Sequence, residues 1–361
     1  MCFSSYRFYA WMTLIFVVFG VFSNTLSFCV FATPTLRGEG GSLFIMAMSV
    51  ADTIVLLTYA VPEWLDHGLP VLIGPCTPWN PINFHIFTCR FIKLVSCASQ
   101  FISAYLVVAF TYQRLYVVYR PLATWKEPKQ KIPAILISAV VLVGFLVSLW
   151  KPILSGLYKF EGIADADELC TRNPDFESEY FVLEVLFAFV TMGLPFVLLV
   201  IGNSFLIYKL RQRKRSMNSM SQSSVSGNAT DKDRKMVYQF AVIFAYLSVI
   251  FSATNLPYFI AYTRVYAAAS DPDLLPDDVT ERIAHKRTLH ALFYSNYSIN
   301  IFIYCFRCSN FRNVLRSWFS RTEEVPPATP GTPGTTRYSS VPSGSSAPPN
   351  QMESSAGSKT S

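Results

Sequence analysis

Seven long apolar stretches limit what this chain can fold into. A helix that crosses a bilayer needs about 20 mainly apolar residues, because it must span the hydrocarbon core. The stretches, numbered spans 1 to 7, cover residues 10–31, 42–64, 91–119, 132–157, 180–209, 237–262 and 289–306. Only 15% of the 361 residues are charged, against about 25% in soluble domains. The sequence therefore predicts an all-α membrane protein, a bundle of seven transmembrane helices over residues 10–306.

The basic residues predict how the spans are oriented. Lys and Arg gather in the segments that follow spans 1, 3, 5 and 7, most densely between Lys209 and Arg215. The opposite side is richer in acids, as in the run from Asp165 to Glu179. Cytoplasmic loops are enriched in Lys and Arg. We therefore expect a multi-pass plasma-membrane protein with an extracellular N-terminus.

The segments outside the spans have distinct compositions. Residues 1–9 form a short extracellular N-terminus, and the polar, Ser-rich residues 212–233 predict a flexible cytoplasmic loop. Residues 308–320 place Phe311 and Trp318 on one helical face and Arg316 on the other, which indicates an interfacial helix on membrane lipid. The Pro-, Ser- and Thr-rich residues 322–361 predict a disordered cytoplasmic tail, which we expect to meet arrestin and kinases.

Each span carries separately placed polar, proline or aromatic residues. They are Asn24 in span 1, Asp52 in span 2, Arg114 after Cys89 in span 3, Trp150 in span 4, Pro195 and Tyr208 in span 5, Phe251 and Pro257 in span 6, and "NIFIY" from Asn300 to Tyr304 in span 7. In order and spacing this set resembles the rhodopsin-like (class A) G-protein-coupled receptors, over nearly the whole chain up to Arg321. The run "SINIFIYCFRCSNFR" looks most like invertebrate neuropeptide receptors of the FMRFamide and myosuppressin type.

Three positions depart from that family's pattern. Gln113 stands where the family has an acid before the span-3 arginine, and Asn255 where it has a tryptophan. Ile301 replaces the proline of its Asn-Pro-x-x-Tyr motif. The resemblance implies G-protein coupling and switching by Gln113, Arg114, Leu115, Tyr208, Phe251, Asn255, Pro257 and Tyr304. Because Gln113 is neutral, we predict raised basal activity.

The resemblance also implies a ligand pocket between the outer halves of the spans. Ser96 replaces the aspartate of amine receptors, and Tyr294 replaces the lysine that binds retinal in opsins, which disfavours both ligands. At the right depth lie Glu63, Trp64, Lys93, Gln100, Glu184, Tyr258, Tyr262, His290 and Tyr294. Buried acids and aromatic rings suit a basic or amidated neuropeptide. The alternative for each residue is a role in bundle packing only.

Two further sites are implied by the resemblance. A disulfide would join Cys89 to Cys170, and the alternative is two free thiols. Apart from the resemblance, Cys2 and Cys76 are the other extracellular cysteines, and a second bridge between them is an open possibility because a leftover outer thiol often pairs. Asp52, Ser103, Asn296 and Asn300 would form a sodium pocket, since oxygen ligands suit a hard cation. Otherwise Asp52 is protonated, hydrogen-bonded and only a packing residue. No other cofactor or metal is expected.

The function implied is that of a receptor that binds an extracellular ligand and activates a heterotrimeric G protein. One alternative is a constitutively active or orphan receptor with a non-peptide ligand. A membrane transporter is more distant, because the two halves of the chain show no internal repeat. An enzyme is not expected, because the spans lack paired catalytic acids or a metal-ligand cluster. Nucleic acid is not expected as a partner.

Overall fold

The computed structural model describes residues 2–38, 40–74, 80–119, 130–159, 168–220, 228–269 and 276–320. The elements below belong to one compact unit, Met1–Phe319. Its long helices are α1 (Cys2–Phe31), α3 (Gly40–Val55), α6 (Ile86–Tyr119), α7 (Lys131–Ser148), α10 (Leu194–Met220), α11 (Asn228–Ala269) and α12 (Pro276–Ser295). Its shorter helices are α2 (Pro34–Arg37), α4 (Val61–His67), α5 (Leu69–Ile73), α8 (Trp150–Ile153), α9 (Glu177–Ala188), α13 (Asn300–Arg307) and α14 (Ser309–Ser320). In the described chain the only strands are β1 (Ser155–Tyr158) and β2 (Leu169–Arg172).

The described chain contains five helical stretches long and apolar enough to cross a membrane. They are Ser5–Phe31, Gly41–Ile73, Ile86–Val117, Lys131–Ile153 and Pro174–Lys209. The predicted spans 6 and 7 lie within α11 and across α12 and α13, where the helix is interrupted after Ser295. The predicted all-α membrane protein is confirmed.

The predicted flexible loop over residues 212–233 is wrong for the part that the structure describes. Helix α10 continues to Met220 and α11 already begins at Asn228, whereas residues 221–227 lie outside the described ranges. Once a helix exists, each added residue gains a hydrogen bond, and Lys, Arg, Gln and Met are good helix formers. The same propagation extends α1 to Cys2, through most of the segment predicted as a short N-terminus. The tail predicted over 322–361 lies outside the described residues.

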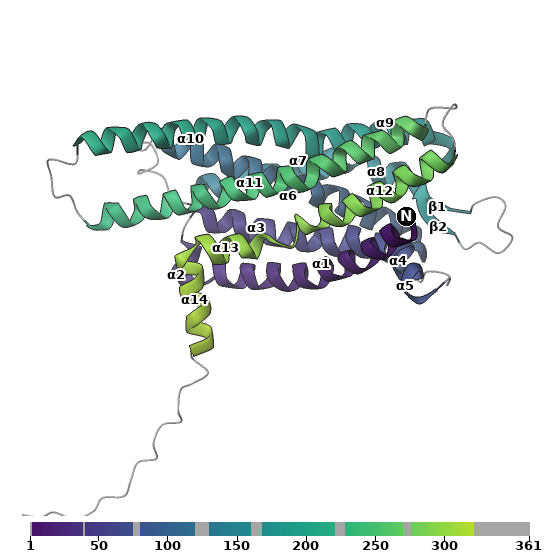
Figure 1. Ribbon diagram of the computed structural model, residues 1–361, viewed down its shortest axis with the longest axis horizontal. Coiled ribbons are helices and arrows are strands. Elements are labelled where there is room, and N and C mark those ends of the chain that lie inside the picture. Colours follow the sequence, from purple (N-terminus) through teal and green to yellow (C-terminus); the bar gives the residue numbers. More distant parts are fainter. Residues whose placement is uncertain are drawn as a thin grey trace, which may run out of the picture. The chain divides into compact units, whose positions relative to one another are not determined.

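Helix α6 occupies the centre of the unit, since it packs against α3, α7, α10 and α11. In the core, the rings of Phe44 on α3 and Phe110 on α6 meet edge to face at 5.1 Å. Gly144 allows α7 to approach closely, because a Cβ there would lie 2.8 Å from the Ile102 side chain. Figure 1 shows these helices running alongside one another, with α14 turning away at the end of α13.

Two helices widen into π-helical turns close to prolines. The turn Leu56–Ala60 precedes Pro62 at the start of α4, and Phe189–Gly193 precedes Pro195 at the start of α10. Proline lacks an N–H, and its ring clashes with the carbonyl four residues earlier. A wider turn relieves that clash, and such turns are frequent at functional sites. Both turns contribute residues to the cavity described below.

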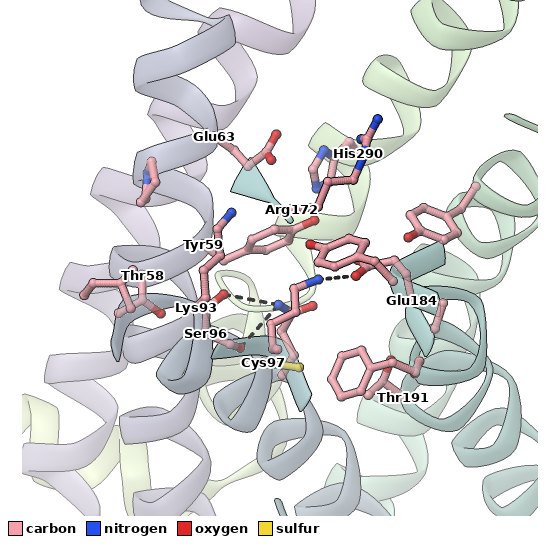
Figure 2. A pocket seen from close by; sticks show the side chains of 18 of the residues that line it. Thr58, Tyr59, Glu63, Lys93, Ser96, Cys97, Arg172, Glu184, Thr191 and His290 are labelled. Carbon is pink, nitrogen blue, oxygen red and sulfur yellow. Dashed lines mark hydrogen bonds and ion pairs between the residues drawn. The ribbon is translucent and has the colours of Figure 1, made fainter. Parts of the chain in front are cut away.

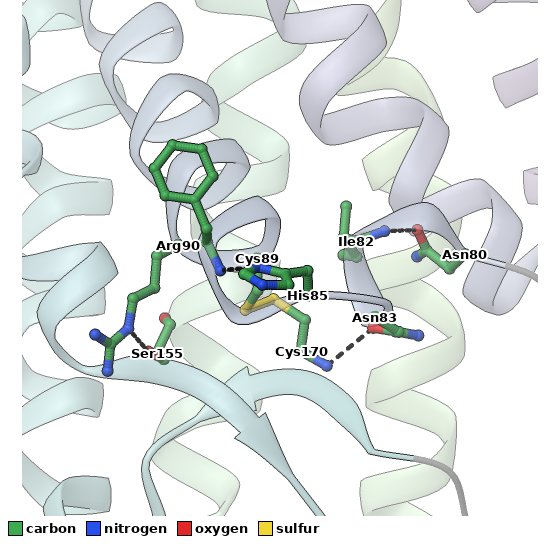
Figure 3. Close-up of a disulfide and its surroundings, with 9 residues drawn as sticks. Asn80, Ile82, Asn83, His85, Cys89, Arg90, Ser155 and Cys170 are labelled. Atoms are coloured by element: carbon green, nitrogen blue, oxygen red, sulfur yellow. Dashed lines mark hydrogen bonds between the residues drawn. A yellow bond between two sulfur atoms is a disulfide. The ribbon is translucent and has the colours of Figure 1, made fainter.

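The β hairpin is anchored to α6 by a disulfide (Figure 3). Cys170 on β2 is bonded to Cys89 near the start of α6, so the predicted bridge is confirmed. The amide N–H of Cys170 also donates to Asn83 Oδ1 at 2.9 Å, and Arg90 Nε donates to the Ser155 carbonyl at 3.1 Å. The end of the helices that carries this hairpin is called the hairpin end below. The predicted pairing of Cys2 with Cys76 lies outside the described side chains.

Helix α14 is seated on α1 and α13 through one buried aromatic ring. Phe311 is fully buried, with ring centres 5.4 Å from Phe31 and 6.0 Å from Tyr304. The guanidinium of Arg312 donates to the Cys305 carbonyl at 2.9 Å, which caps the end of α13. The sequence-predicted amphipathic helix is therefore present as a helix.

Candidate ligand-binding site and switch residues

A cavity of about 240 Å³ opens between the helices at the hairpin end. Its lining comes from segments far apart in the sequence, including Tyr59, Glu63, Lys93, Gln100, Lys151, Glu184, Tyr258, Tyr262, Lys286, Arg287 and His290. Figure 2 shows Glu63, Glu184 and His290 reaching the same space from different helices. Pockets for drug-sized ligands run from about 300 to 1,000 Å³. This cavity therefore has room for one or two side chains of a larger ligand.

Most of the predicted ligand-binding residues line this cavity, and two do not. Glu63, Lys93, Gln100, Glu184, Tyr258, Tyr262 and His290 are lining residues. Trp64 instead points to α1, where its Nε1 donates to the Ala10 carbonyl at 2.8 Å. Successive residues of a helix point about 100° apart, so Glu63 and Trp64 face different neighbours. Tyr294 is fully buried and stacks on His290 at 4.5 Å, outside the lining.

Sequence reasoning missed two lining residues for which a signal was present. Tyr59 precedes Glu63 by one helical turn, so a ligand-facing Glu63 already implies a Tyr59 on the same face. Lys151 is a cation at the end of an apolar span, and such a charge needs a partner or a role. Lys286 and Arg287 on α12 also line the cavity.

Both cavity acids expected to meet a basic ligand are ion-paired within the chain. Glu63 Oε2 accepts from Arg287 Nη1 at 3.0 Å. Lys151 Nζ is hydrogen-bonded to the carboxylate of Glu184. Burial disfavours the charge of Arg287, but the nearby Glu63 carboxylate outweighs it and raises the pKa of Arg287 above its usual range. A basic ligand would have to displace these internal cations.

A cluster of aromatic rings lies beside the cavity, one helical turn from Asn255, the residue that replaces the family's tryptophan. Tyr258 stacks on His290 with ring centres 4.7 Å apart, and Tyr59 meets Tyr294 edge to face at 5.8 Å. One turn below Tyr258, the Asn255 amide turns back on its own helix and donates to the Phe251 carbonyl at 2.8 Å. The Tyr258–His290 stack thus joins α11 to α12, and Tyr258 directly follows Pro257, the proline inside α11.

The sodium prediction falls on a closed polar cluster between α3, α6 and α13. Ser103 Oγ donates to Asp52 Oδ1 at 2.5 Å, and Asn300 Nδ2 donates to Asp52 Oδ2 at 2.8 Å. Asn296 is also buried, but in the described chain it makes no hydrogen bond to Asp52, Ser103 or Asn300. Carboxylate and hydroxyl oxygens fit a hard cation. Among the described residues, no group of three or more His, Cys, Asp or Glu side chains gathers to hold another metal.

Two of the predicted coupling residues, Gln113 and Arg114, lie toward the other end of α6. Arg114 is buried, with its guanidinium carbon 4.6 Å from the centre of the Phe110 ring. Gln113 is buried beside it, and its Oε1 has no hydrogen-bond donor in the described chain. Tyr208 is 62% exposed, whereas Tyr304 is buried edge-on against Phe31 at 5.4 Å.

The remaining predicted switch residues lie in the core. Phe251 is buried in the main hydrophobic cluster, Leu115 is half-buried, and Pro257 interrupts the hydrogen bonding of α11 from within. These positions are consistent with a bend of α11 at Pro257, next to the packed core that contains Phe251.

The membrane helices, the disulfide-anchored hairpin and the cavity beneath it define a helical transmembrane receptor. The family model described as serpentine type 7TM GPCR chemoreceptor Srw matches residues 11–322. The chain belongs to this family of seven-transmembrane G-protein-coupled receptors.

Several curated receptors are similar at low identity. The B1 bradykinin receptor of Homo sapiens is 23% identical over 229 residues, which cover 63% of this chain and 60% of that receptor's own length. Galanin receptor type 1 of Homo sapiens is 23% identical over 325 residues, 85% of this chain and 79% of that receptor. The FMRFamide peptide receptor frpr-18 of Caenorhabditis elegans is 29% identical over 133 residues, 35% of this chain and 29% of that receptor. The predicted resemblance to class A receptors is confirmed.

Proposed function

We propose that this chain is a plasma-membrane receptor that binds a peptide in the cavity from the extracellular side and activates a heterotrimeric G protein. The cavity carries the proposal, because it combines charged side chains with aromatic walls and opens beneath the disulfide-anchored hairpin. Curated relatives are named as receptors for bradykinin, galanin and FMRFamide peptides, which supports a peptide ligand. With the hairpin end outside, the cavity is open to such a ligand.

Signalling would be a population shift between two arrangements of α11. A ligand that touches the Tyr258–His290 stack changes the contact between α11 and α12. Because Pro257 removes a hydrogen bond within α11, the helix bends there at low cost. The bend would open the far end, where Arg114 meets the G protein. Kinases and arrestin would act on the Ser- and Thr-rich tail, and α14 would lie on inner-leaflet lipid.

A sodium ion at Asp52 would modulate this equilibrium. The carboxylate of Asp52 and the hydroxyl of Ser103 supply oxygen ligands, and the amide of Asn300 orients the carboxylate. An ion bound there favours the state in which α3, α6 and α13 stay together. This is linkage between two sites, so agonist and sodium would weaken each other's binding by the same factor.

A peptide screen tests the function. The full chain is expressed in cells and exposed to a panel of synthetic neuropeptides, amidated ones included, while G-protein dissociation is measured. We expect a peptide to activate the wild type and to lose at least about tenfold in potency on Tyr262→Leu, which alters the lining. Ile260→Ala, on the exposed side of the same helix, should respond as the wild type does.

The outcome also separates the alternatives. Ligand-free activity that no peptide raises would support the constitutively active or orphan receptor. Peptide responses that Tyr262→Leu leaves unchanged would contradict binding in this cavity.

A further inference from the structure

The cavity carries an excess of positive charge. Among the described residues that line it, five are Lys or Arg and three are Asp or Glu. The Glu63 and Glu184 carboxylates contact Arg287 and Lys151. Asp66, the third acid, accepts a hydrogen bond from the Asn80 amide at 2.9 Å. All three carboxylates therefore already have partners within the chain.

Among the described lining cations, Lys93 is the one that has neither an ion pair nor a ring contact. Arg172 is paired with Glu177 at 2.5 Å and stacks on the Phe181 ring. Lys286 lies 4.7 Å from the centre of the Tyr262 ring. The Lys93 ammonium makes no hydrogen bond or ion pair with a described residue, although its side chain is half-buried. A cation removed from water in this way is costly unless an anion meets it.

Lys93 is also held in a fixed place. It lies one helical turn after Cys89, whose disulfide anchors α6 to the hairpin. Ser96 and Gln100 continue the same face of α6 deeper into the cavity, where the Gln100 amide donates to the Ser96 carbonyl at 3.3 Å. The Tyr258 and Tyr262 rings form the wall contributed by α11. A lysine at a fixed point of α6, in a cavity that also has aromatic rings, suits a ligand group that joins an anion to an apolar side chain.

We propose that Lys93 binds a carboxylate of the ligand, which is either a free C-terminus or an Asp or Glu side chain. The inference rests on the proposed peptide-receptor function and names the chemistry that the cavity recognises. A ligand carboxylate would form a charge-assisted hydrogen bond with the Lys93 ammonium. A ligand ammonium or guanidinium at the same place would add to the excess charge, or would break the Glu63–Arg287 pair and leave Arg287 buried alone.

Small probes test the subsite without a known agonist. The purified full chain is titrated with three small probes. They are N-acetylphenylalanine, its neutral amide, and the α-amide of N-acetylaspartate, which keeps only the side-chain carboxylate. Thermal stability is measured, because a ligand of the folded state raises Tm with the logarithm of its concentration. We expect a carboxylate probe to raise Tm and the neutral amide to have little effect. If N-acetylphenylalanine raises Tm more, the ligand carboxylate is a C-terminus. If the aspartate probe raises Tm more, the ligand carboxylate belongs to an Asp or Glu side chain.

Variants assign the effect to Lys93. Lys93→Gln should abolish the rise in Tm and Lys93→Arg should retain it. Lys159→Gln, which removes an exposed cation just after β1, should also retain it. Equal stabilisation by acid and amide, or full stabilisation of Lys93→Gln, overturns the inference.

Peptides then separate this inference from the function on which it rests. An activating peptide that carries the carboxylate should lose at least about tenfold in potency on Lys93→Gln, the cost of a charge-assisted contact. Activation that is equally strong for acid and amide forms of every active peptide overturns the inference and leaves the receptor function standing. Carboxylate binding at Lys93 in a chain that no peptide activates overturns the function and leaves the subsite standing.

Discussion

The side-chain amide of Asn24 donates a hydrogen bond to the main-chain carbonyl of Tyr297 at 2.8 Å. Tyr297 lies in the turn that separates α12 from α13, and the next carbonyl, of Ser298, accepts from Ser23 Oγ at 2.8 Å. Gly20 keeps α1 close to this turn, because a Cβ there would lie 2.6 Å from Ser298 Oγ. Class A receptors carry a proline just after this region, and here the position is Ile301. Polar side chains of α1 therefore donate hydrogen bonds to the free carbonyls at this helix break, which forms without a proline.

Replacing Asn24 should destabilise the protein through this break. In Asn24→Ala the buried Tyr297 carbonyl loses its donor, which we expect to cost about 1–3 kcal/mol. The measurement is the Tm of the purified protein. Thr25→Ala is the matched control, since the Thr25 hydroxyl bonds only the Val21 carbonyl of its own helix and is exposed. Equal Tm losses in the two variants would contradict the role given to Asn24.

Sodium dependence should be lost in Asp52→Asn. This change removes the only carboxylate of the Asp52–Ser103–Asn300 cluster, and a neutral amide binds a hard cation weakly. We expect agonist affinity of the wild type to fall about 5- to 10-fold as sodium replaces a larger cation, within the usual range of coupling energies. Thr53→Val, one residue along α3, should keep that dependence. A sodium effect that survives in Asp52→Asn would leave Asp52 with a packing role only.

Basal activity should fall in Gln113→Glu. Gln113 is buried beside Arg114, and its Oε1 lacks a donor in the described chain, so a carboxylate there gains a charged neighbour. Stabilising the inactive state by about 1 kcal/mol would lower ligand-free G-protein activation about fivefold. Gln212→Glu, at an exposed position of α10, provides the control. Unchanged basal signalling would mean that another contact already restrains Arg114.

The Glu63–Arg287 ion pair should contribute more to stability than the more exposed Arg172–Glu177 pair. Glu63→Gln leaves Arg287 without its carboxylate at a site where the Arg287 side chain is only 17% exposed, and we expect a loss of about 1–3 kcal/mol. The double variant with Arg287→Gln should recover part of it. Glu177→Gln breaks a pair whose side chains are 41% and 49% exposed, and should cost less than about 1 kcal/mol. Thermal unfolding of the wild type, of the single variants Glu63→Gln and Arg287→Gln, and of the double variant gives the coupling energy. A value near zero would contradict the pairing.

Individual residues show how far local reasoning reaches. Asp52 and Arg114 stand out in the sequence because charges are rare and costly in apolar spans. Cys89 and Cys170 were paired only through the family resemblance, and the structure contains that disulfide. The flexible loop failed as a prediction, because polar composition does not stop a helix that good helix formers can extend.

The sequence by itself determined the membrane helices, since the length of an apolar stretch is a local property that the bilayer thickness sets. The family followed from the order and spacing of single residues along those helices. Only the tertiary structure decided which charges meet. Glu63 and Arg287 lie 224 residues apart, and no local rule pairs them. Helix rotation likewise decided that Glu63 faces the cavity while its neighbour Trp64 turns to α1. Rotation and pairing depend on how all the helices pack together, and this is why the chemistry of the cavity became visible only in three dimensions.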